Sequence, residues 1–288
     1  MKLALGTAQF GLAYGIANPQ PQISLTESQA IIAYAHQQGM HVIDTAIGYG
    51  NSEERLGEIG VQSWKIISKL PEIPATENVQ AWIYQSVKAS LEKLKVKSLY
   101  GLLLHRPSQL LGDKGVAIYA ALQQLKSDGL VEKIGASIYQ PSELDVLLAI
   151  GKMDVIQSPL SVLDRRLITS GWLDRLADQG IEIHARSVFL QGILLMAADE
   201  RPKKFDRWSN LWGSYQKWLH DTGMSPLQAC LAYVSSIPQV QQVVVGVNGL
   251  NHIKEILDAQ IDKAPAWSSD LAIDDEALLN PLSWLNIA

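Results

Sequence analysis

Eight short runs of apolar and β-branched residues alternate with longer segments of helical periodicity along the 288-residue chain. The sequence predicts strands at residues 2–6, 41–44, 65–69, 98–104, 133–136, 154–157, 181–185 and 242–246. It predicts helices at residues 26–38, 52–59, 77–94, 115–128, 142–150, 166–179, 207–236 and 250–258, with a break in the seventh near Gly223. Because neighbouring parallel strands need a helix-sized connection, this alternation predicts an α/β fold with a parallel sheet.

The even spacing of these units favours a closed (β/α)8 TIM barrel, whose typical length is about 250 residues. The main competitor, an open doubly wound sheet, usually carries a glycine-rich turn after its first strand. The segment from Gly6 to Gly11 lacks the paired glycines of that turn. We therefore predict a single domain over residues 1–288, with a tail from about residue 264 that packs over the barrel.

Local signals mark where several helices begin and end. Gly39, Gly129 and Gly180 each separate a helical segment from a strand, and glycine closes a helix in the left-handed conformation at little steric cost. Thr26, with Gln29 three residues later, predicts a capping box at the start of the first long helix.

Composition excludes several classes of partner. The net charge is −5 and lysines and arginines do not cluster, which argues against binding to nucleic acid or an anionic membrane. No segment reaches the roughly 20 apolar residues of a membrane span, so we expect a cytoplasmic protein. The only cysteine, Cys230, lies in an apolar helical stretch and predicts a buried, inert thiol. The histidines are scattered, and we predict no metal site.

Polar side chains follow three successive predicted strands, at the barrel end where active sites lie. These are Asp44, Lys69 and His105, and Tyr49 lies in the loop five residues after Asp44. Each has a structural alternative, because Asp44 could cap a helix, Lys69 could be a solvated strand end, and His105 could be a hydrogen-bonded rim residue. Their occurrence together at one end of the barrel favours a catalytic site.

These four residue types suit the reduction of a carbonyl group, which needs a hydride at carbon and a proton at oxygen. Tyrosine has an ordinary pKa of about 10, which is too high for efficient proton exchange near neutrality. A neighbouring ammonium stabilises the phenolate, and Lys69 would supply that charge while Asp44 keeps it protonated. Tyr49 would then be the general acid, and His105 would orient the substrate carbonyl.

The motifs around these residues resemble the aldo/keto reductase family. They include Gly6-Thr7, Ile43-Asp-Thr-Ala-Ile-Gly-Tyr-Gly50, Asn51-Ser-Glu-Glu54, Ile67-Ser-Lys69, Leu103-Leu-His105 and Gly135-Ala-Ser137. The resemblance implies an NADP(H)-dependent oxidoreductase acting on CH–OH groups, with NAD(H) as the alternative cofactor and a small carbonyl compound as substrate. It also implies a set of cofactor-binding residues, namely Gly6, Thr7, Ser137, Gln157, Ser187, Phe189, Gln191, Gly192, Gly246, Asn248, His252 and Glu255.

The sequence departs from the family pattern at four cofactor positions. Ile138 replaces an asparagine that binds the nicotinamide amide, and Leu160 stands where an aromatic ring usually stacks. Asn248 stands where the family usually has a cation for the 2′-phosphate of NADPH, and Ile256 aligns with an asparagine near the adenine. NADPH remains the expectation from the family pattern.

Two other functions remain open from the sequence. The altered nicotinamide contacts would suit a non-catalytic barrel that binds the cofactor as a redox sensor or regulator. A lyase with a Schiff base on Lys69 is also possible, although Asp44 argues against a neutral amine. The sequence gives little information on the identity of the substrate. The candidates for the pocket mouth are Phe10, Tyr14, Ile47, Arg106 and residues 208–218.

Overall fold

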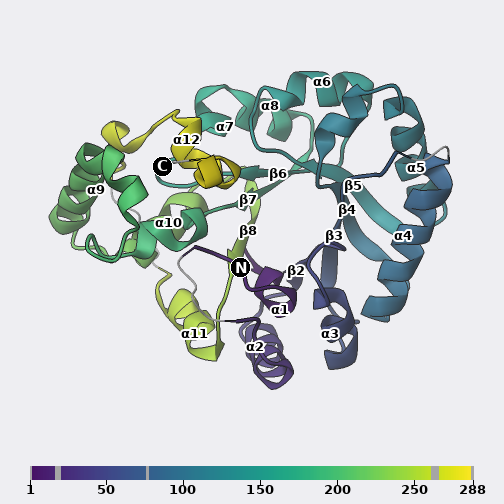
Figure 1. Cartoon of the computed structure of the whole chain (residues 1–288), viewed down its shortest axis with the longest axis horizontal. Coiled ribbons are helices and arrows are strands. Elements are labelled where there is room, and N and C mark those ends of the chain that lie inside the picture. Colours follow the sequence, from purple (N-terminus) through teal and green to yellow (C-terminus); the bar gives the residue numbers. More distant parts are fainter. Residues whose placement is uncertain (1, 17–20, 76–77, 261–265, 287–288) are drawn as a thin grey trace.

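The eight strands form a closed parallel barrel in the computed structural model, which describes residues 2–16, 21–75, 78–260 and 266–286 (Figure 1). Neighbours follow the chain order, and the first strand pairs with both the second and the last. The strands are β1 (Leu3–Gly6), β2 (Val42–Asp44), β3 (Lys65–Leu70), β4 (Leu99–Leu104), β5 (Val131–Ser137), β6 (Val155–Pro159), β7 (Glu182–Arg186) and β8 (Val240–Gly246). The predicted TIM barrel is therefore confirmed.

Helices surround the barrel and bury its outer face (Figure 1). They are α1 (Ala8–Gly11), α2 (Leu25–Gln37), α3 (Ser52–Ile59), α4 (Val79–Leu94), α5 (Gly115–Ser127), α6 (Glu143–Ile150), α7 (Arg166–Thr169), α8 (Trp172–Asp178), α9 (Ser209–Thr222), α10 (Pro226–Ser235), α11 (Leu250–Asp258) and α12 (Glu276–Leu279). Short 3-10 turns η1 (Pro107–Leu111), η2 (Leu190–Leu195), η3 (Lys203–Trp208), η4 (Ser269–Leu271) and η5 (Pro281–Asn286) complete the described elements. Among the described residues, no helix is long and apolar enough to cross a bilayer.

Two apolar layers hold the barrel together. The larger lies between strands and helices, and a smaller cluster joins side chains from five strands, namely Ala4, Val42, Ile67, Leu103 and Val155. Because successive side chains of a strand point to opposite faces, each of these five strands contributes to both layers. Polar side chains therefore concentrate where the strands end, and this positions the site described below.

Most local predictions agree with the structure. Gly39, Gly129 and Gly180 all have a positive φ, between +68° and +85°, as expected of glycines that close helices. The predicted break near Gly223 separates α9 from α10. Cys230 is fully buried, and burial raises its pKa to about 12, which makes it an inert thiol.

Two local predictions were wrong. The helix predicted at residues 166–179 is divided into α7 and α8 by Gly171, which has a φ of +75°. The first long helix is capped by Ser24, whose Oγ accepts the backbone N–H of Glu27 at 3.1 Å, and Thr26 lies inside the helix. The side chain of Glu27 binds elsewhere, and that contact becomes important below.

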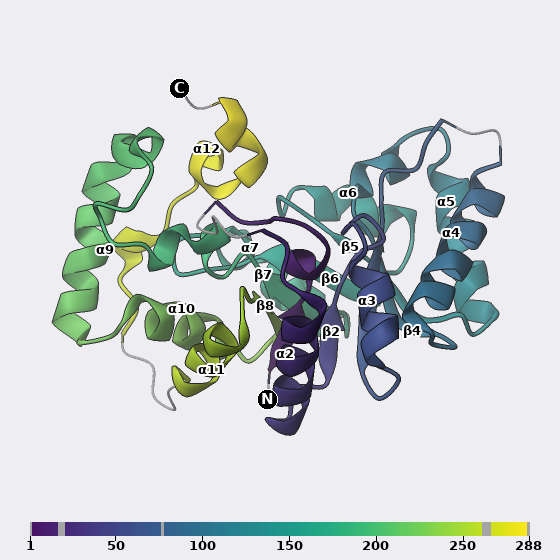
Figure 2. The same ribbon diagram turned by 60° about the horizontal axis from the view of Figure 1, so that its bottom comes forward.

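The C-terminal segment from residue 266 packs along one side of the barrel mouth, beside α9 (Figure 2). Trp208 donates its indole N–H to Asp275 at 2.8 Å, and the buried ring of Trp284 meets Phe205 edge to face. Pro281 and Leu282 reach a hollow that also touches Tyr49 and His105. Parts of the predicted tail, residues 264–265 and 287–288, lie outside the described residues.

Candidate active site

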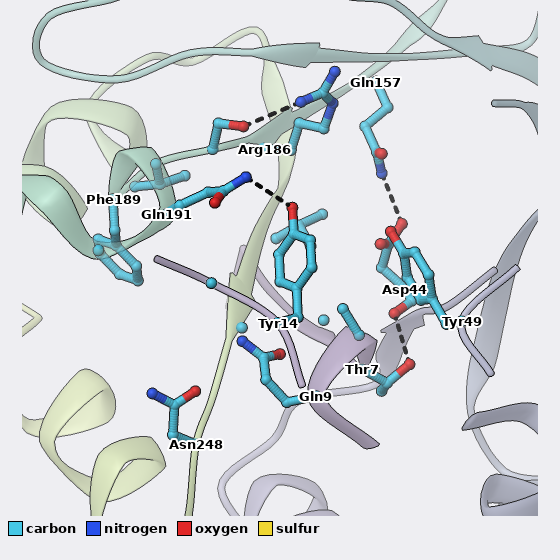
Figure 3. Close-up of a pocket in the computed structure, with 18 of the residues that line it drawn as sticks. Thr7, Gln9, Tyr14, Asp44, Tyr49, Gln157, Arg186, Phe189, Gln191 and Asn248 are labelled. Atoms are coloured by element: carbon cyan, nitrogen blue, oxygen red, sulfur yellow. Dashed lines mark hydrogen bonds between the residues drawn. The ribbon is translucent and has the colours of Figure 1, made fainter. Parts of the chain in front are cut away.

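A cavity of about 410 Å³ lies at the carboxyl ends of the strands (Figure 3). Every strand contributes a lining residue within two residues of its end. In chain order these residues are Gly6, Asp44, Lys69, His105, Ser137, Gln157, Arg186 and Gly246. The four predicted catalytic side chains therefore line one cavity.

Asp44 and Lys69 form a buried ion pair at the bottom of this cavity. The Lys69 Nζ donates to the Asp44 Oδ1 at 2.7 Å and to the carbonyl of Thr45 at 2.9 Å. Gln157 donates its amide to the other Asp44 oxygen at 2.7 Å. Burial lowers the pKa of Lys69, but the Asp44 carboxylate and Tyr49 oppose this and leave it above the ordinary value. Lys69 is therefore a fixed ammonium.

The phenol of Tyr49 lies between this ammonium and His105. The Lys69 Nζ is 5.2 Å from the centre of the Tyr49 ring, and the His105 ring meets it edge to face at 6.0 Å. Two backbone bonds fix the loop that carries the tyrosine, from Tyr49 N to the Ala46 carbonyl and from Ile47 N to the Lys69 carbonyl. The phenol thus has a cation and a second hydrogen-bonding ring as immediate neighbours.

Close packing of Gly11 against this loop leads to a first prediction. A Cβ on Gly11 would lie 1.7 Å from the Tyr49 carbonyl oxygen, so the backbone would have to move. We expect Gly11→Ala to lower the free energy of unfolding by about 1–3 kcal/mol, as overpacking does. The matched control is Gly213→Ala in α9, where a Cβ meets nothing within 4 Å and a gain of about 0.5–1 kcal/mol is expected. Chemical denaturation of both variants measures the difference, and equal behaviour would contradict the packing argument.

His105 is held in its neutral form. Burial, and then the charges of Lys69 and Arg186, lower its pKa to about 4 from an ordinary value of 6.5. The uncharged ring contributes stability above pH 6.5 that is lost as the pH falls through 4. At neutral pH the ring can therefore donate one N–H to a carbonyl oxygen without carrying a charge.

This shift predicts the titration of the His105 ring. Its NMR signals should stay constant between pH 8 and 5.5 and move only near pH 4. The spectrum of His105→Gln assigns the signals of this ring. A His105 midpoint near 6.5 would contradict the neutral form.

The loop after β7 has an unusual backbone. Ser187, Leu190, Gln191 and Gly192 all have a positive φ, between +47° and +94°. Such a conformation is uncommon for residues other than glycine, and strained backbone of this kind clusters at ligand sites. Turns of this type direct successive backbone N–H groups into a concave anion site.

The opposite wall of the cavity also fits a large polar ligand. The side-chain Oε1 of Gln9 is buried and has no hydrogen-bond partner among the described residues. Gly246 faces the Gln9 amide, and a Cβ there would lie 3.2 Å from it. An unsatisfied acceptor, a glycine that leaves the cavity open and an anion-binding loop together suit a dinucleotide with its pyrophosphate.

Comparison with known proteins decides the family. A model described as the aldo/keto reductase family matches residues 2–266. This chain belongs to the aldo/keto reductase family. The family was predicted from the sequence, and it is confirmed.

Two curated relatives match part of this reductase. An NADH-specific methylglyoxal reductase of Escherichia coli is 30% identical over an alignment of 192 residues, with 57% of this chain and 56% of that protein covered. A glyoxal reductase of Bacillus subtilis is 31% identical over an alignment of 192 residues, with 65% of this chain and 65% of that protein covered. The matches therefore span less than two thirds of either relative.

Solved structures share the fold of this reductase at low identity. An aldo-keto reductase from Bacillus halodurans, in its holo form, has a TM-score of 0.72 at 19% identity, with 92% of this chain and 88% of that one covered. A glycerol dehydrogenase from Gluconobacter oxydans has a TM-score of 0.70 at 22% identity, with coverage of 90% and 86%. At these identities the likeness establishes the fold alone.

The fold brings nearly all the residues predicted to bind a cofactor to the same cavity. The ones that line the cavity are Gly6, Thr7, Ser137, Gln157, Ser187, Phe189, Gln191, Gly192, Gly246, Asn248 and His252. Glu255 does not line it and is exposed on α11. Ile138, Leu160 and Ile256, where the sequence departs from the family, are fully buried in the apolar core. Those three positions are therefore packing positions.

Only some of the residues predicted for the pocket mouth lie at the pocket. Tyr14 lines the cavity, and Arg106 lines the adjoining hollow. Phe10 is fully buried in the core, and Trp212 is buried with its indole N–H donated to the Phe205 carbonyl. Trp212 therefore contributes to core packing and does not line the pocket.

Sequence reasoning missed Arg186, whose guanidinium projects into the cavity (Figure 3). It donates to the hydroxyls of Ser137 and Ser187 and to the carbonyl of Ile138, at 2.8 to 3.2 Å. Among the described residues it forms no ion pair with a carboxylate, so its charge faces the site. The predicted strand ended at residue 185, and one more residue would have placed this cation at a strand end. Tyr139 and Gln9 were missed as well.

Proposed function

We propose that this protein reduces small aldehydes or ketones with a nicotinamide cofactor. The observation that carries the proposal is the position of Tyr49, which lies between the fixed ammonium of Lys69 and the neutral ring of His105. A phenol with these neighbours can supply a proton and then hold the charge that remains. Family membership supports the same chemistry.

Each side chain has a different role in the reduction of the carbonyl group. His105 donates a hydrogen bond that orients the carbonyl oxygen, and Tyr49 protonates that oxygen as it gains negative charge. Lys69 stabilises the resulting phenolate, and Asp44 holds Lys69 in place. A bound nicotinamide supplies the hydride that goes to carbon. The carbonyl compound thus gains one hydride and one proton to become the alcohol, and solvent returns a proton to Tyr49.

The residues that would hold the cofactor lie along the same cavity. Ser187 and the left-handed residues after it would bind the pyrophosphate, while Ser137 and Gln157 would face the nicotinamide amide. Arg186 already bonds the Ser137 hydroxyl and would add positive charge near the reacting oxygen. In the reverse direction the same groups would oxidise an alcohol.

The names of the two curated relatives support small dicarbonyl substrates. One is a methylglyoxal reductase and the other a glyoxal reductase, so we propose methylglyoxal and glyoxal as the first substrates to test. The relatives do not support the expected preference for NADPH, because the first is NADH-specific.

A Schiff-base lyase has little support in this geometry. A nucleophilic lysine needs a lowered pKa, whereas Asp44 raises that of Lys69. The non-catalytic alternative is tested by turnover.

The experiment is a turnover assay paired with a binding assay. Methylglyoxal and glyoxal are offered with NADH and with NADPH, and consumption of reduced cofactor is followed. Quenching of tryptophan fluorescence reports binding of each cofactor independently. Turnover of either substrate with either cofactor supports the proposal. Tight binding without turnover across a broader aldehyde panel would instead favour the non-catalytic reading, and absence of both would overturn the cofactor site.

A further inference from the structure

The cavity has two chemically different ends, which fixes the direction of a bound dinucleotide. Tyr49 lies at one end and Asn248 at the other, beyond Gln9 (Figure 3). Lys69 lies beside Tyr49, and His252 accepts the Asn248 N–H. Under the proposed function, hydride transfer must occur beside Tyr49. The nicotinamide therefore lies at that end, and the adenosine ribose lies towards Asn248, where α11 begins. NADPH and NADH differ only by a 2′-phosphate on this ribose.

A carboxylate from another helix already occupies this start of α11. Glu27, on α2, accepts the backbone N–H of Leu250, the first residue of α11, at 2.6 Å. A Cβ on Gly249 would lie 3.1 Å from the same Glu27 oxygen, so glycine permits this approach. The bond joins residues 223 positions apart and ties α2 to α11. The amide that would otherwise receive an anion thus has a negatively charged partner.

The described residues around this point offer no cation for a phosphate. Burial lowers the pKa of His252, so its ring is neutral, and its Nδ1 accepts the Asn248 N–H at 3.2 Å. The Lys254 ammonium lies over the Tyr34 ring, 5.5 Å from its centre. The fixed cations of the cavity, Lys69 and Arg186, belong to the opposite end.

The two cofactors would meet this carboxylate differently. A phosphate monoester carries a charge of about −1.5 to −2 at neutral pH, and it would have to displace Glu27 or lie against it. Like charges placed together repel each other and weaken binding. A free ribose 2′-hydroxyl can instead donate a hydrogen bond to a carboxylate, as acidic residues accept it in other NAD sites.

We propose that Glu27 makes this reductase select NADH over NADPH, by holding a carboxylate at the start of α11 where the 2′-phosphate would lie. This inference rests on the proposed function and names its cofactor. It reverses the preference expected from the family pattern.

The test compares dissociation constants of both cofactors, measured by tryptophan quenching, for the wild type and for Glu27→Gln. The wild type should bind NADH about ten-fold more tightly than NADPH, or better. Glutamine keeps an oxygen for the Leu250 N–H but removes the charge. Glu27→Gln should therefore improve NADPH binding several-fold, with little change for NADH. Added salt should narrow the wild-type difference, because screening weakens like-charge repulsion.

The matched control is Asp258→Asn, which removes the same charge from the far end of α11 and should leave the ratio unchanged. Thermal melting of each variant establishes that it is folded. Equal affinities in the wild type, or a parallel change for both cofactors in Glu27→Gln, would overturn the inference and leave the reductase intact. Binding of neither cofactor by the wild type would overturn the proposed function itself.

Discussion

Tyr49→Phe should lower kcat by about 10²-fold to 10⁴-fold, the usual contribution of a positioned general acid. The ring keeps its place between Lys69 and His105, so only the proton donor is lost. Cofactor affinity should change little, because the phenol oxygen faces the substrate. Steady-state kinetics with methylglyoxal and tryptophan quenching with the cofactor measure the two quantities separately.

Tyr14→Phe is the matched control, because Tyr14 also presents a hydroxyl to the cavity. Its hydroxyl accepts from Gln191 at 3.4 Å and lies away from the Asp44–Lys69 pair (Figure 3). We expect a change in KM rather than a collapse of kcat. If Tyr49→Phe retained most of its turnover, the proton would come from another group and the mechanism would be wrong.

Lys69→Met should lower the free energy of unfolding by about 3–5 kcal/mol, as expected when one partner of a buried ion pair is removed. The Asp44 carboxylate would remain buried, with only the Gln157 amide as a hydrogen-bond partner on its side chain. Turnover should also be lost, because no cation would remain beside Tyr49. Denaturant titration monitored by circular dichroism measures the stability change.

The double variant Asp44→Asn/Lys69→Met should regain part of this stability, because neither buried charge remains. Lys93→Met is the control, since Lys93 pairs with Glu54 at 3.1 Å on the surface and exposed pairs contribute below about 1 kcal/mol. Equal losses for Lys69→Met and Lys93→Met would show that the buried pair is not the stabilising element we describe.

The barrel and the side chains that line its cavity at the strand ends were predictable because their signals are local. Each strand is an apolar run of a few residues, and Asp44, Lys69 and His105 stand where such runs end. Helix ends were predictable where a glycine takes a positive φ, as at Gly39. The break at Gly171 followed the same rule but was missed, because the helical pattern continues on both sides of it.

The start of α2 shows what local signals cannot decide. Ser24 with Glu27 and Thr26 with Gln29 both have the spacing of a capping box. Ser24 is the cap, while the Glu27 side chain is engaged by Leu250, far along the chain. Arg186 was missed for a related reason, since its direction depends on how far β7 pairs with β6. Both residues act through contacts that only the folded chain creates.

Pairing of β1 with β8 has a consequence for how the chain is made. Gly246 is synthesised 240 residues after its partner Gly6, and both line the cavity. Until then β1 has one open edge, which can pair with other chains. A dinucleotide bound in this cavity would touch residues on both sides of this last seam. Cofactor present during synthesis should therefore favour the closed barrel by mass action and raise the yield of folded protein.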